Sequence, residues 1–308
     1  MRICILGAGA MGMLTGSLLS TGNDVWLLDV DQGRVDAICA EGVYIQEGDQ
    51  IRTFHPNAAS SAKGMPVMDL VIVFVKAMYT VAALEANRDL LGPDTYLMTL
   101  QNGAGHENKL LQFADRDHVI IGTTQHNSSI IEQAHVNHGG GGKSFIGLIA
   151  GNSARVACIA ENFTKCGIDC SISDDVQKQI WNKLFLNTSA SALTAVLQVP
   201  LGFILDDPHA CQLMETLARE AVAVANADNI STFEPEQVVA DIKTVLANAR
   251  GGYTSIYADV KNGVHSEVDT ISGSVVEAAH RLRVPVPYHE MLVLLIHAME
   301  NKTKNHIC

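Results

Sequence analysis

The chain has 308 residues, of which 47% are hydrophobic, enough for about two domains with sizeable cores. Its formal net charge is −12, and Lys and Arg form no dense cluster, which argues against a nucleic-acid partner. No apolar run approaches the roughly 20 residues that span a bilayer, so we expect no membrane partner. The seven cysteines are scattered without a zinc-binding pattern, which is typical of free thiols in a reducing cytoplasm.

The first motif is the stretch "ILGAGAMGMLTGSLL", which begins at Ile5. It could be the apolar part of a signal peptide, but its glycines have the spacing G-x-G-x-x-G directly after a short apolar run. That spacing is typical of the turn that binds a dinucleotide pyrophosphate at a helix N-terminus. The residues expected to contact the cofactor there are Gly7, Ala8, Gly9, Ala10, Met11 and Gly12.

The stretch "NDVWLLDVD" follows at strand length and ends near Asp29, about twenty residues after the glycines. An acid at this position binds the ribose 2′-OH and repels a 2′-phosphate, so NAD(H) is the expected cofactor and NADP(H) the alternative. Arg34 lies a turn into the next helix, where we expect it to be solvated. Asp31 is better placed than Asp29 to cap that helix.

Strand-like and helix-like stretches alternate as far as residue 173, which predicts a doubly wound α/β domain. The expected strands are Arg2–Leu6, Val25–Asp29, Val43–Gln46, Leu70–Lys76, Tyr96–Leu100, Val119–Gly122, Ser144–Ile149 and Asp169–Ile172. Helices are expected at Met11–Leu19, Arg34–Glu41 and Ala154–Lys165.

From Asp174 onward the pattern becomes helical throughout. The expected helices are Val176–Ala195, His209–Ala227, Pro235–Ala249, Val268–Leu282 and Tyr288–Asn301. The sequence therefore predicts a Rossmann-type dinucleotide-binding domain over residues 1–173 and an all-α substrate and catalytic domain over residues 174–308.

The stretch "IWNKLFLNTSASALTAVLQVPLG" carries polar residues on an otherwise apolar helix. Lys183, Asn187 and Ser191 are each four residues apart and should share one face. Burial there would lower the pKa of the lysine and make it a useful general acid. The alternative is a solvated helix edge with an extended Lys183. Glu267, in "HSEVDTISG", would by itself most often be a surface or capping carboxylate.

Six ordered motifs together resemble the ketopantoate reductase family (2-dehydropantoate 2-reductase) over essentially the whole chain. They are "GAGAMG", "VIVFVKA", "LQNG", "IGTTQHNSS", "WNKLFLN" and "HSEVDTISG". The resemblance implies reduction of a 2-oxo acid to a D-2-hydroxy acid with a reduced nicotinamide cofactor, in a cleft between the two domains.

By position in these motifs, the resemblance implies that Lys183 is the general acid and that Glu267 orients it. Asn102 would contact both the nicotinamide ribose and the substrate. Other cofactor contacts would come from Lys76 and Asn127, and other substrate contacts from Asn187, Ser191 and Ser255.

Two positions depart from the members that reduce ketopantoate, which usually carry asparagines where this chain has Ser191 and Leu201. A less polar pocket would suit bulkier 2-oxo acids, and "NGAGHE" resembles the D-2-hydroxy acid dehydrogenase branch of the family. A non-catalytic nucleotide-sensing protein is the alternative of another class, which the set of Lys183, Glu267, Asn102 and Ser255 disfavours.

We expect no metal, because no carboxylate stands at ligand spacing beside His126, His135 and His138. The expected partner is a small 2-oxo acid, and a homodimer stays open.

Overall fold

The computed structural model describes residues 1–151 and 154–304, which form two compact units. The first comprises Met1–Gln101 and His106–Val176, and the second comprises Asn102–Gly105 with the chain from Gln177 onward. No helix in the described part of the chain is long and apolar enough to cross a membrane.

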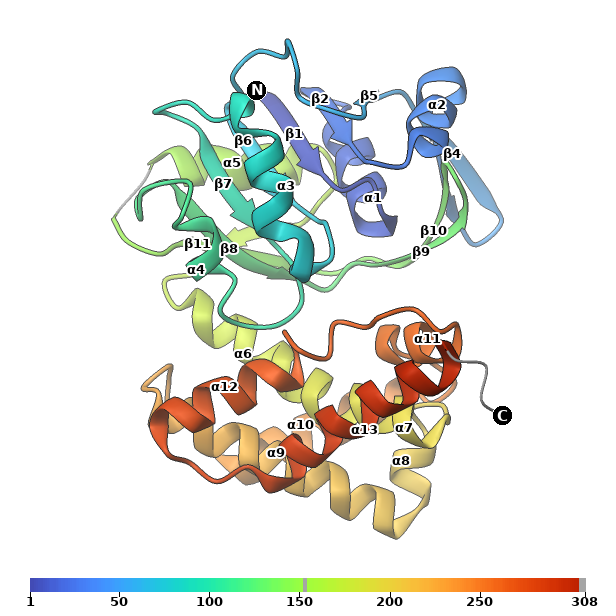
Figure 1. The fold of residues 1–308 in the computed structure, drawn as a ribbon, viewed down its shortest axis with the longest axis vertical. Coiled ribbons are helices and arrows are strands. Elements are labelled where there is room, and N and C mark those ends of the chain that lie inside the picture. Colours follow the sequence, from blue (N-terminus) through green and yellow to red (C-terminus); the bar gives the residue numbers. More distant parts are fainter. Residues whose placement is uncertain (152–153, 305–308) are drawn as a thin grey trace. The chain divides into compact units, whose positions relative to one another are not determined.

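The first unit is built on a sheet of eight strands in the order β12-β11-β8-β7-β6-β1-β2-β5 (Figure 1). Neighbouring strands are parallel except for β11 and β8, which are antiparallel. These strands are β1 (Arg2–Leu6), β2 (Asp24–Leu28), β5 (Asn57–Ala59), β6 (Leu70–Val73), β7 (Tyr96–Thr99), β8 (Val119–Thr124), β11 (Ser144–Leu148) and β12 (Cys170–Ile172).

The central strands explain why the sequence shows continuous apolar runs. β6 and β8 are buried at every position, and β1 at every position after Arg2. Strands with both faces covered do not alternate between polar and apolar residues. The helical segments of this unit are α1 (Ala10–Leu19), α2 (Gln32–Glu41), η1 (Ala77–Tyr79), α3 (Thr80–Ala86), η2 (Arg88–Leu90), α4 (Glu107–Leu110) and α5 (Ala154–Lys165).

A second sheet of four strands, in the order β4-β3-β10-β9, extends the first unit. β3 and β10 pair in parallel, whereas the outer strands pair antiparallel to their neighbours. The strands are β3 (Val43–Glu47), β4 (Gln50–Phe54), β9 (Asn127–Glu132) and β10 (His135–Gly140). The sequence predicts only β3 of these, because β4 and β9 are mostly exposed and lack an apolar face.

The second unit is helical in its described part (Figure 1). Its elements are α6 (Val176–Leu186), η3 (Asn187–Ser191), α7 (Ala192–Leu197), α8 (Phe203–Asp206), α9 (Pro208–Ala227), α10 (Pro235–Asn248), α11 (Ser255–Lys261), α12 (Ser272–Leu282) and α13 (Pro287–Lys304). The Rossmann-type α/β fold followed by helices is the predicted fold class, which is confirmed.

Local signals set the ends of these helices. α9 begins where the Asp207 side chain accepts hydrogen bonds from the backbone N–H groups of His209 and Ala210, with Pro208 as the first helical residue. The predicted helix Val268–Leu282 begins four residues late, at Ser272, because Val268–Ile271 form turns.

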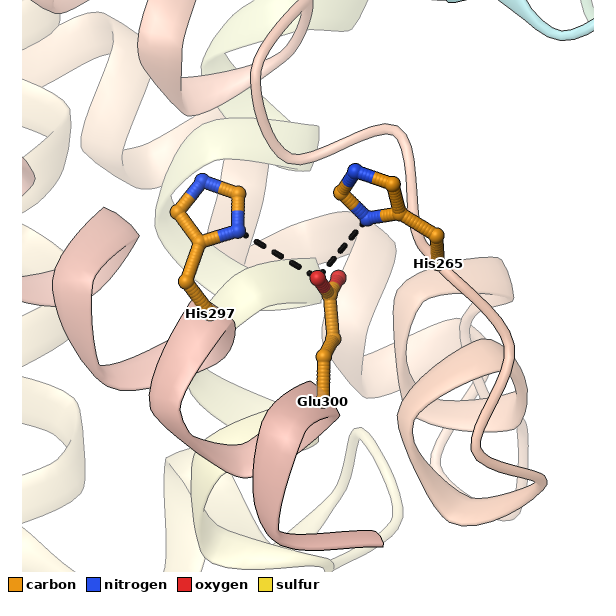
Figure 2. A group of neighbouring side chains, drawn as sticks. All are labelled: His265, His297 and Glu300. Atoms are coloured by element: carbon orange, nitrogen blue, oxygen red, sulfur yellow. Dashed lines mark hydrogen bonds and ion pairs between the residues drawn. The ribbon is translucent and has the colours of Figure 1, made fainter. Parts of the chain in front are cut away.

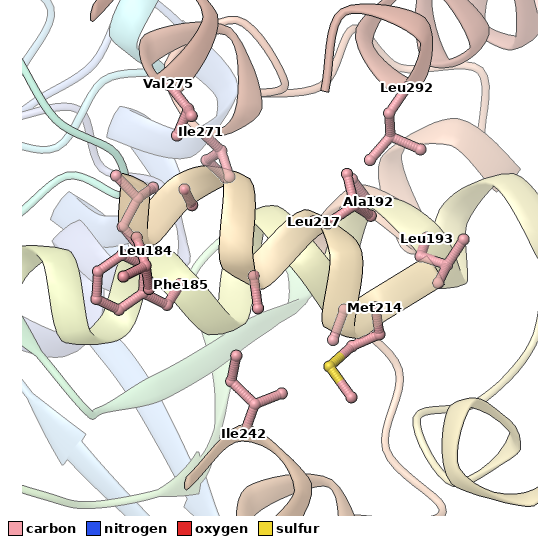
Figure 3. Packing of buried hydrophobic residues seen from close by; sticks show 14 of the residues in the cluster. Leu184, Phe185, Ala192, Leu193, Met214, Leu217, Ile242, Ile271, Val275 and Leu292 are labelled. Atoms are coloured by element: carbon pink, nitrogen blue, oxygen red, sulfur yellow. The ribbon is translucent and has the colours of Figure 1, made fainter. Parts of the chain in front are cut away.

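The core of the second unit gathers around α6, α7 and α9 (Figure 3). The Phe185 ring packs edge-on against Phe233, at 4.9 Å between ring centroids, and 5.8 Å from Trp181. Met214 and Leu217 are fully enclosed by the same cluster. This packing fixes the helix on which Lys183 stands.

Candidate active site

The glycine turn between β1 and α1 has the geometry that a phosphate-binding loop requires. Gly7 has φ +100°, which favours glycine, and its N–H donates to the carbonyl of Leu28 at 2.8 Å. A Cβ at Gly7 would stand 2.7 Å from the backbone nitrogen of Val75, and one at Gly12 would overlap the carbonyl oxygen of Gly7. These two glycines allow strand, turn and helix to pack closely.

Gly9 serves a different purpose. No atom lies within 4 Å of the place where its Cβ would stand, and its backbone is extended without positive φ. Gly9 is also the N-cap of α1, and no side chain caps the helix there. A bare helix N-terminus beside open space fits a pyrophosphate, which backbone N–H groups would bind. The turn therefore fits the dinucleotide that the motif predicts.

A cavity of about 310 Å³ lies beside this turn. It is lined by Gly7 and Asp29, at the ends of β1 and β2, and by apolar residues of α3 such as Ala82 and Ala86. The carboxyl ends of parallel strands are the usual ligand edge of such a sheet. The size and mostly apolar lining suit a heteroaromatic ring, with Asp29 as the polar group at its rim.

Asp29 is held by three hydrogen bonds. Its carboxylate accepts the backbone N–H of Ala8 at 2.8 Å and that of Asp31 at 3.0 Å. Arg34 approaches it at 3.4 Å, and the two side chains are only 17% and 12% exposed. The expectation of a solvated Arg34 is therefore wrong, because the first turn of α2 starts beside Asp29.

Asp31 caps α2, as predicted, by accepting the backbone N–H of Arg34 at 3.2 Å. It also lies 3.8 Å from the guanidinium of Arg34. One guanidinium thus faces two carboxylates, and the local charge of the three side chains is about −1.

Lys76 lies just beyond β6, which ends at Val73, three residues earlier than predicted. The loop that carries it is fixed by Gln101, a residue that the sequence did not single out. The Gln101 amide donates to the Val75 carbonyl at 2.5 Å and to the Thr80 hydroxyl at 3.1 Å. The position of Gln101 directly before Asn102 in "LQNG" is the feature of the sequence that could have identified it.

Asn127 begins β9 and follows His126, whose ring stacks on that of His138. The Nδ1 atom of His126 lies 3.0 Å from Nε2 of His138, and Glu47 lies 2.5 Å from the other ring nitrogen of His138. The sequence places no carboxylate at ligand spacing from these histidines, and the fold brings Glu47 to them from a distant segment. Glu47 is 91 residues from His138 in sequence, and the pairing of β3 with β10 brings them together.

In the second unit, the predicted single helix over Val176–Ala195 is interrupted by a π-helical turn at Asn187–Ser191. An α-helix turns roughly 100° per residue, so residues four apart drift about 40° around it. A π turn holds an extra residue and moves later side chains back toward the starting face. The interruption therefore favours the alignment of Ser191 with Lys183 and Asn187.

Side-chain hydroxyl groups donate hydrogen bonds to the backbone carbonyls around this turn. Ser189 donates to the carbonyl of Phe185 at 2.6 Å, and Thr194 to that of Ser191 at 2.8 Å. Thr254, the N-cap of α11, also donates to the Ser191 carbonyl at 3.3 Å and lies 3.1 Å from the Thr194 hydroxyl. Ser255 is the next residue, so these bonds place the Ser191 and Ser255 backbones close together.

Lys183 has a strongly lowered pKa. Burial lowers its pKa from an ordinary value of 10.5 to about 8, while the charge of Glu267 acts in the opposite direction. A fully solvated lysine would not show this shift, which favours the interpretation of Lys183 as a functional group.

The segment Asn102–Gly105 groups with the helical unit, although its neighbours in sequence belong to the first unit. Gly103 has φ +107°, and a Cβ there would overlap the carbonyl oxygen of Thr270. The "LQNG" and "HSEVDTISG" motifs therefore meet backbone to backbone. The structure thus gathers Asn102, Lys183, Asn187, Ser191, Ser255 and Glu267 in the helical unit, and the glycine turn, Asp29, Lys76 and Asn127 in the other.

A glycine turn on a parallel sheet, followed by a helical unit with a lysine of lowered pKa, is the arrangement of a nucleotide-dependent oxidoreductase. Residues 3–151 match the family described as ketopantoate reductase PanE/ApbA, and residues 175–300 match its C-terminal part. The chain therefore belongs to the ketopantoate reductase family, whose members are oxidoreductases acting on a CH–OH group.

Individual relatives cover nearly the whole chain. The 2-dehydropantoate 2-reductase of Halobacterium salinarum is 32% identical over 93% of this chain and 95% of its own length. The structure of D-mandelate dehydrogenase with NADH and anilino(oxo)acetate has a TM-score of 0.93 and 26% identity, covering 99% of this chain and all of that one. The crystal structure of 2-dehydropantoate 2-reductase from Geobacter metallireducens GS-15 has a TM-score of 0.91 and 28% identity. This similarity covers 97% of this chain and 99% of that one.

Proposed function

We propose that this chain reduces a 2-oxo acid to a D-2-hydroxy acid with a reduced nicotinamide dinucleotide, and that 2-dehydropantoate (ketopantoate) is its substrate. The observation that carries the proposal is Lys183, a partly exposed residue of α6 whose pKa is lowered by burial to about 8 while the charge of Glu267 opposes the shift. The names of the full-length relatives support the choice of substrate.

The nicotinamide supplies the hydride when it is bound. Lys183 then faces the oxygen of the reduced carbonyl, stabilises the negative charge that develops there and donates a proton to it. A pKa near 8 leaves most of the lysine charged at neutral pH while keeping it acidic enough to give up its proton. Glu267 keeps the pKa from falling further and orients the ammonium.

The remaining site residues bind and orient the cofactor and the substrate. The α1 N-terminus at Gly9 binds the pyrophosphate, and Lys76 and Asn127 contribute further cofactor contacts. Asn102 contacts both cofactor and substrate. Asn187 and Ser191, the first and last residues of the π turn, hold the substrate together with Ser255, which lies beside the substrate carboxylate.

The same residues support a second candidate, a D-2-hydroxy acid dehydrogenase for branched or aromatic 2-oxo acids. Ser191 and Leu201 stand where ketopantoate-reducing members usually carry asparagines, and Leu201 is partly buried against the apolar core of the helical unit. The similarity to D-mandelate dehydrogenase over the whole chain supports this branch. A nucleotide sensor would not require a lysine of lowered pKa such as Lys183.

We expect Lys183→Ala to lower kcat for reduction by about 10³–10⁴-fold, because the proton donor and the positive charge are lost together. Dinucleotide affinity should persist, since the glycine turn lies in the other unit. Glu267→Ala should lower kcat by a smaller factor than Lys183→Ala does. The matched control is Lys178→Ala on the same helix, whose ammonium lies 5.9 Å from the Phe233 ring centre.

The same variants are compared by pH profile. The Lys183 ammonium must be protonated to act, so kcat/KM for reduction should be full well below pH 8 and fall as pH rises through the pKa of about 8. Lys183→Ala should lack this alkaline limb. A variant with wild-type kcat and an unchanged limb would assign Lys183 to a solvated helix edge.

NADH is expected to give a higher kcat/KM than NADPH. Arg34 faces Asp29 and Asp31 together, so a 2′-phosphate would meet a net negative charge. Asp29→Ser should raise the NADPH-to-NADH ratio at least tenfold, because Arg34 then becomes available to the phosphate. Asp24→Ser, at the opposite end of β2, is the control. Equal or better use of NADPH by the wild type would contradict this assignment.

A substrate panel decides between the two candidates. Steady-state reduction of ketopantoate, phenylpyruvate, benzoylformate and 2-ketoisocaproate is measured with both cofactors. With Ser191 and Leu201 in the pocket, each lost hydrogen bond to the ketopantoate hydroxyl would cost roughly 1–3 kcal/mol, so the bulkier acids should be used as well. If ketopantoate exceeds every other acid by several orders of magnitude, these two residues do not line the pocket.

A further inference from the structure

A cluster of two histidines and a glutamate lies in the helical unit (Figure 2). His297 and Glu300 stand one turn apart on α13, and His265 approaches from the segment that precedes Glu267. Glu300 Oε2 lies 2.8 Å from Nδ1 of His265 and 3.3 Å from Nδ1 of His297. One ligand atom from each residue can be chosen so that all three lie within 4.8 Å of one another.

The glutamate is fixed by bonds that use its other oxygen. Glu300 Oε1 accepts the backbone N–H of Ser266 at 2.9 Å and the Ser266 hydroxyl at 2.6 Å. The side chain is 10% exposed. Oε2 is thereby turned toward the two imidazoles, as Figure 2 shows.

His297 is oriented in the same way. Its Nε2 lies 2.9 Å from Oδ1 of Asp269, so its Nδ1 faces Glu300. A carboxylate bonded to the outer nitrogen of a histidine fixes the ring and its tautomer in many metal sites. Two of the three candidate ligands are therefore held in place by hydrogen bonds, Glu300 by Ser266 and His297 by Asp269.

Two of the three distances between ligand atoms, those from Glu300 Oε2 to the two imidazoles, are close to the distances around a tetrahedral ion. Zinc bonds to nitrogen and oxygen of about 2.0–2.2 Å place neighbouring ligand atoms roughly 3.3 Å apart. The 3.3 Å distance already has this value, and the 2.8 Å distance needs an opening of about 0.5 Å. His265 is 49% exposed, so its side chain can make that movement and an ion can enter beside it.

We propose that His265, His297 and Glu300 form a binding site for a divalent zinc-type ion. Two imidazoles and one carboxylate are a ligand set that zinc accepts, with the fourth position left to water. A bound ion would tie the segment that leads into Glu267 to α13. This departs from the expectation of no metal, which considered only histidines that are close in sequence.

The site is tested by calorimetric titration of chelator-treated full-length protein with Zn²⁺. We expect one saturable site per chain, and at least a tenfold loss of affinity in His265→Gln and in His297→Gln. His265→Gln should fold normally because its side chain is half exposed. The matched control is His280→Gln, which removes a surface histidine 2.6 Å from Glu290 and should bind Zn²⁺ like the wild type.

X-ray absorption at the zinc edge identifies the ligands, because exposed Cys39 and Cys158 could also bind zinc. The proposal requires only nitrogen and oxygen neighbours near 2.0–2.1 Å. It is overturned by sulfur near 2.3 Å, by the absence of saturable binding, or by equal affinity in the two variants and the wild type. Any of these results would leave the cluster as a hydrogen-bonded network alone.

Discussion

The burial of one ammonium group beside one carboxylate is the constraint on which the helical unit depends. An isolated buried cation is costly, and Glu267 offsets part of that cost for Lys183. The residues that position this pair are spread along the chain. α6 is fixed by the aromatic packing of Phe185, and the Glu267 segment is held through Ser266 by Glu300.

The π turn belongs to the same arrangement. Widening the helix at Asn187–Ser191 disturbs regular carbonyl pairing, and the hydroxyls of Ser189, Thr194 and Thr254 compensate. The apolar neighbours and the polar stripe of this helix could both be predicted from the sequence. The interruption could not, because Ser and Thr in "NTSAS" are equally compatible with a regular helix.

The parallel sheet can be predicted from the sequence for a clear physical reason. Strands such as β6 and β8 are buried on both faces and carry unbroken apolar runs, and the glycine turn has a fixed spacing. The second sheet was not accessible, since β4 and β9 expose nearly all their residues. The contact of Glu47 with His138 depends on the pairing of β3 with β10, and that of Arg34 with Asp29 on where α2 begins, so neither follows from local sequence patterns.

We propose that burial lowers the pKa of Lys183 to about 8 and that the charge of Glu267 opposes this shift. Direct titration of the Lys183 side chain by NMR, in wild type and in Glu267→Gln, tests it most directly. We expect a pKa of about 8 in the wild type and a lower value in Glu267→Gln, where the carboxylate charge is gone. A wild-type pKa near the ordinary 10.5, unchanged by the substitution, would contradict it.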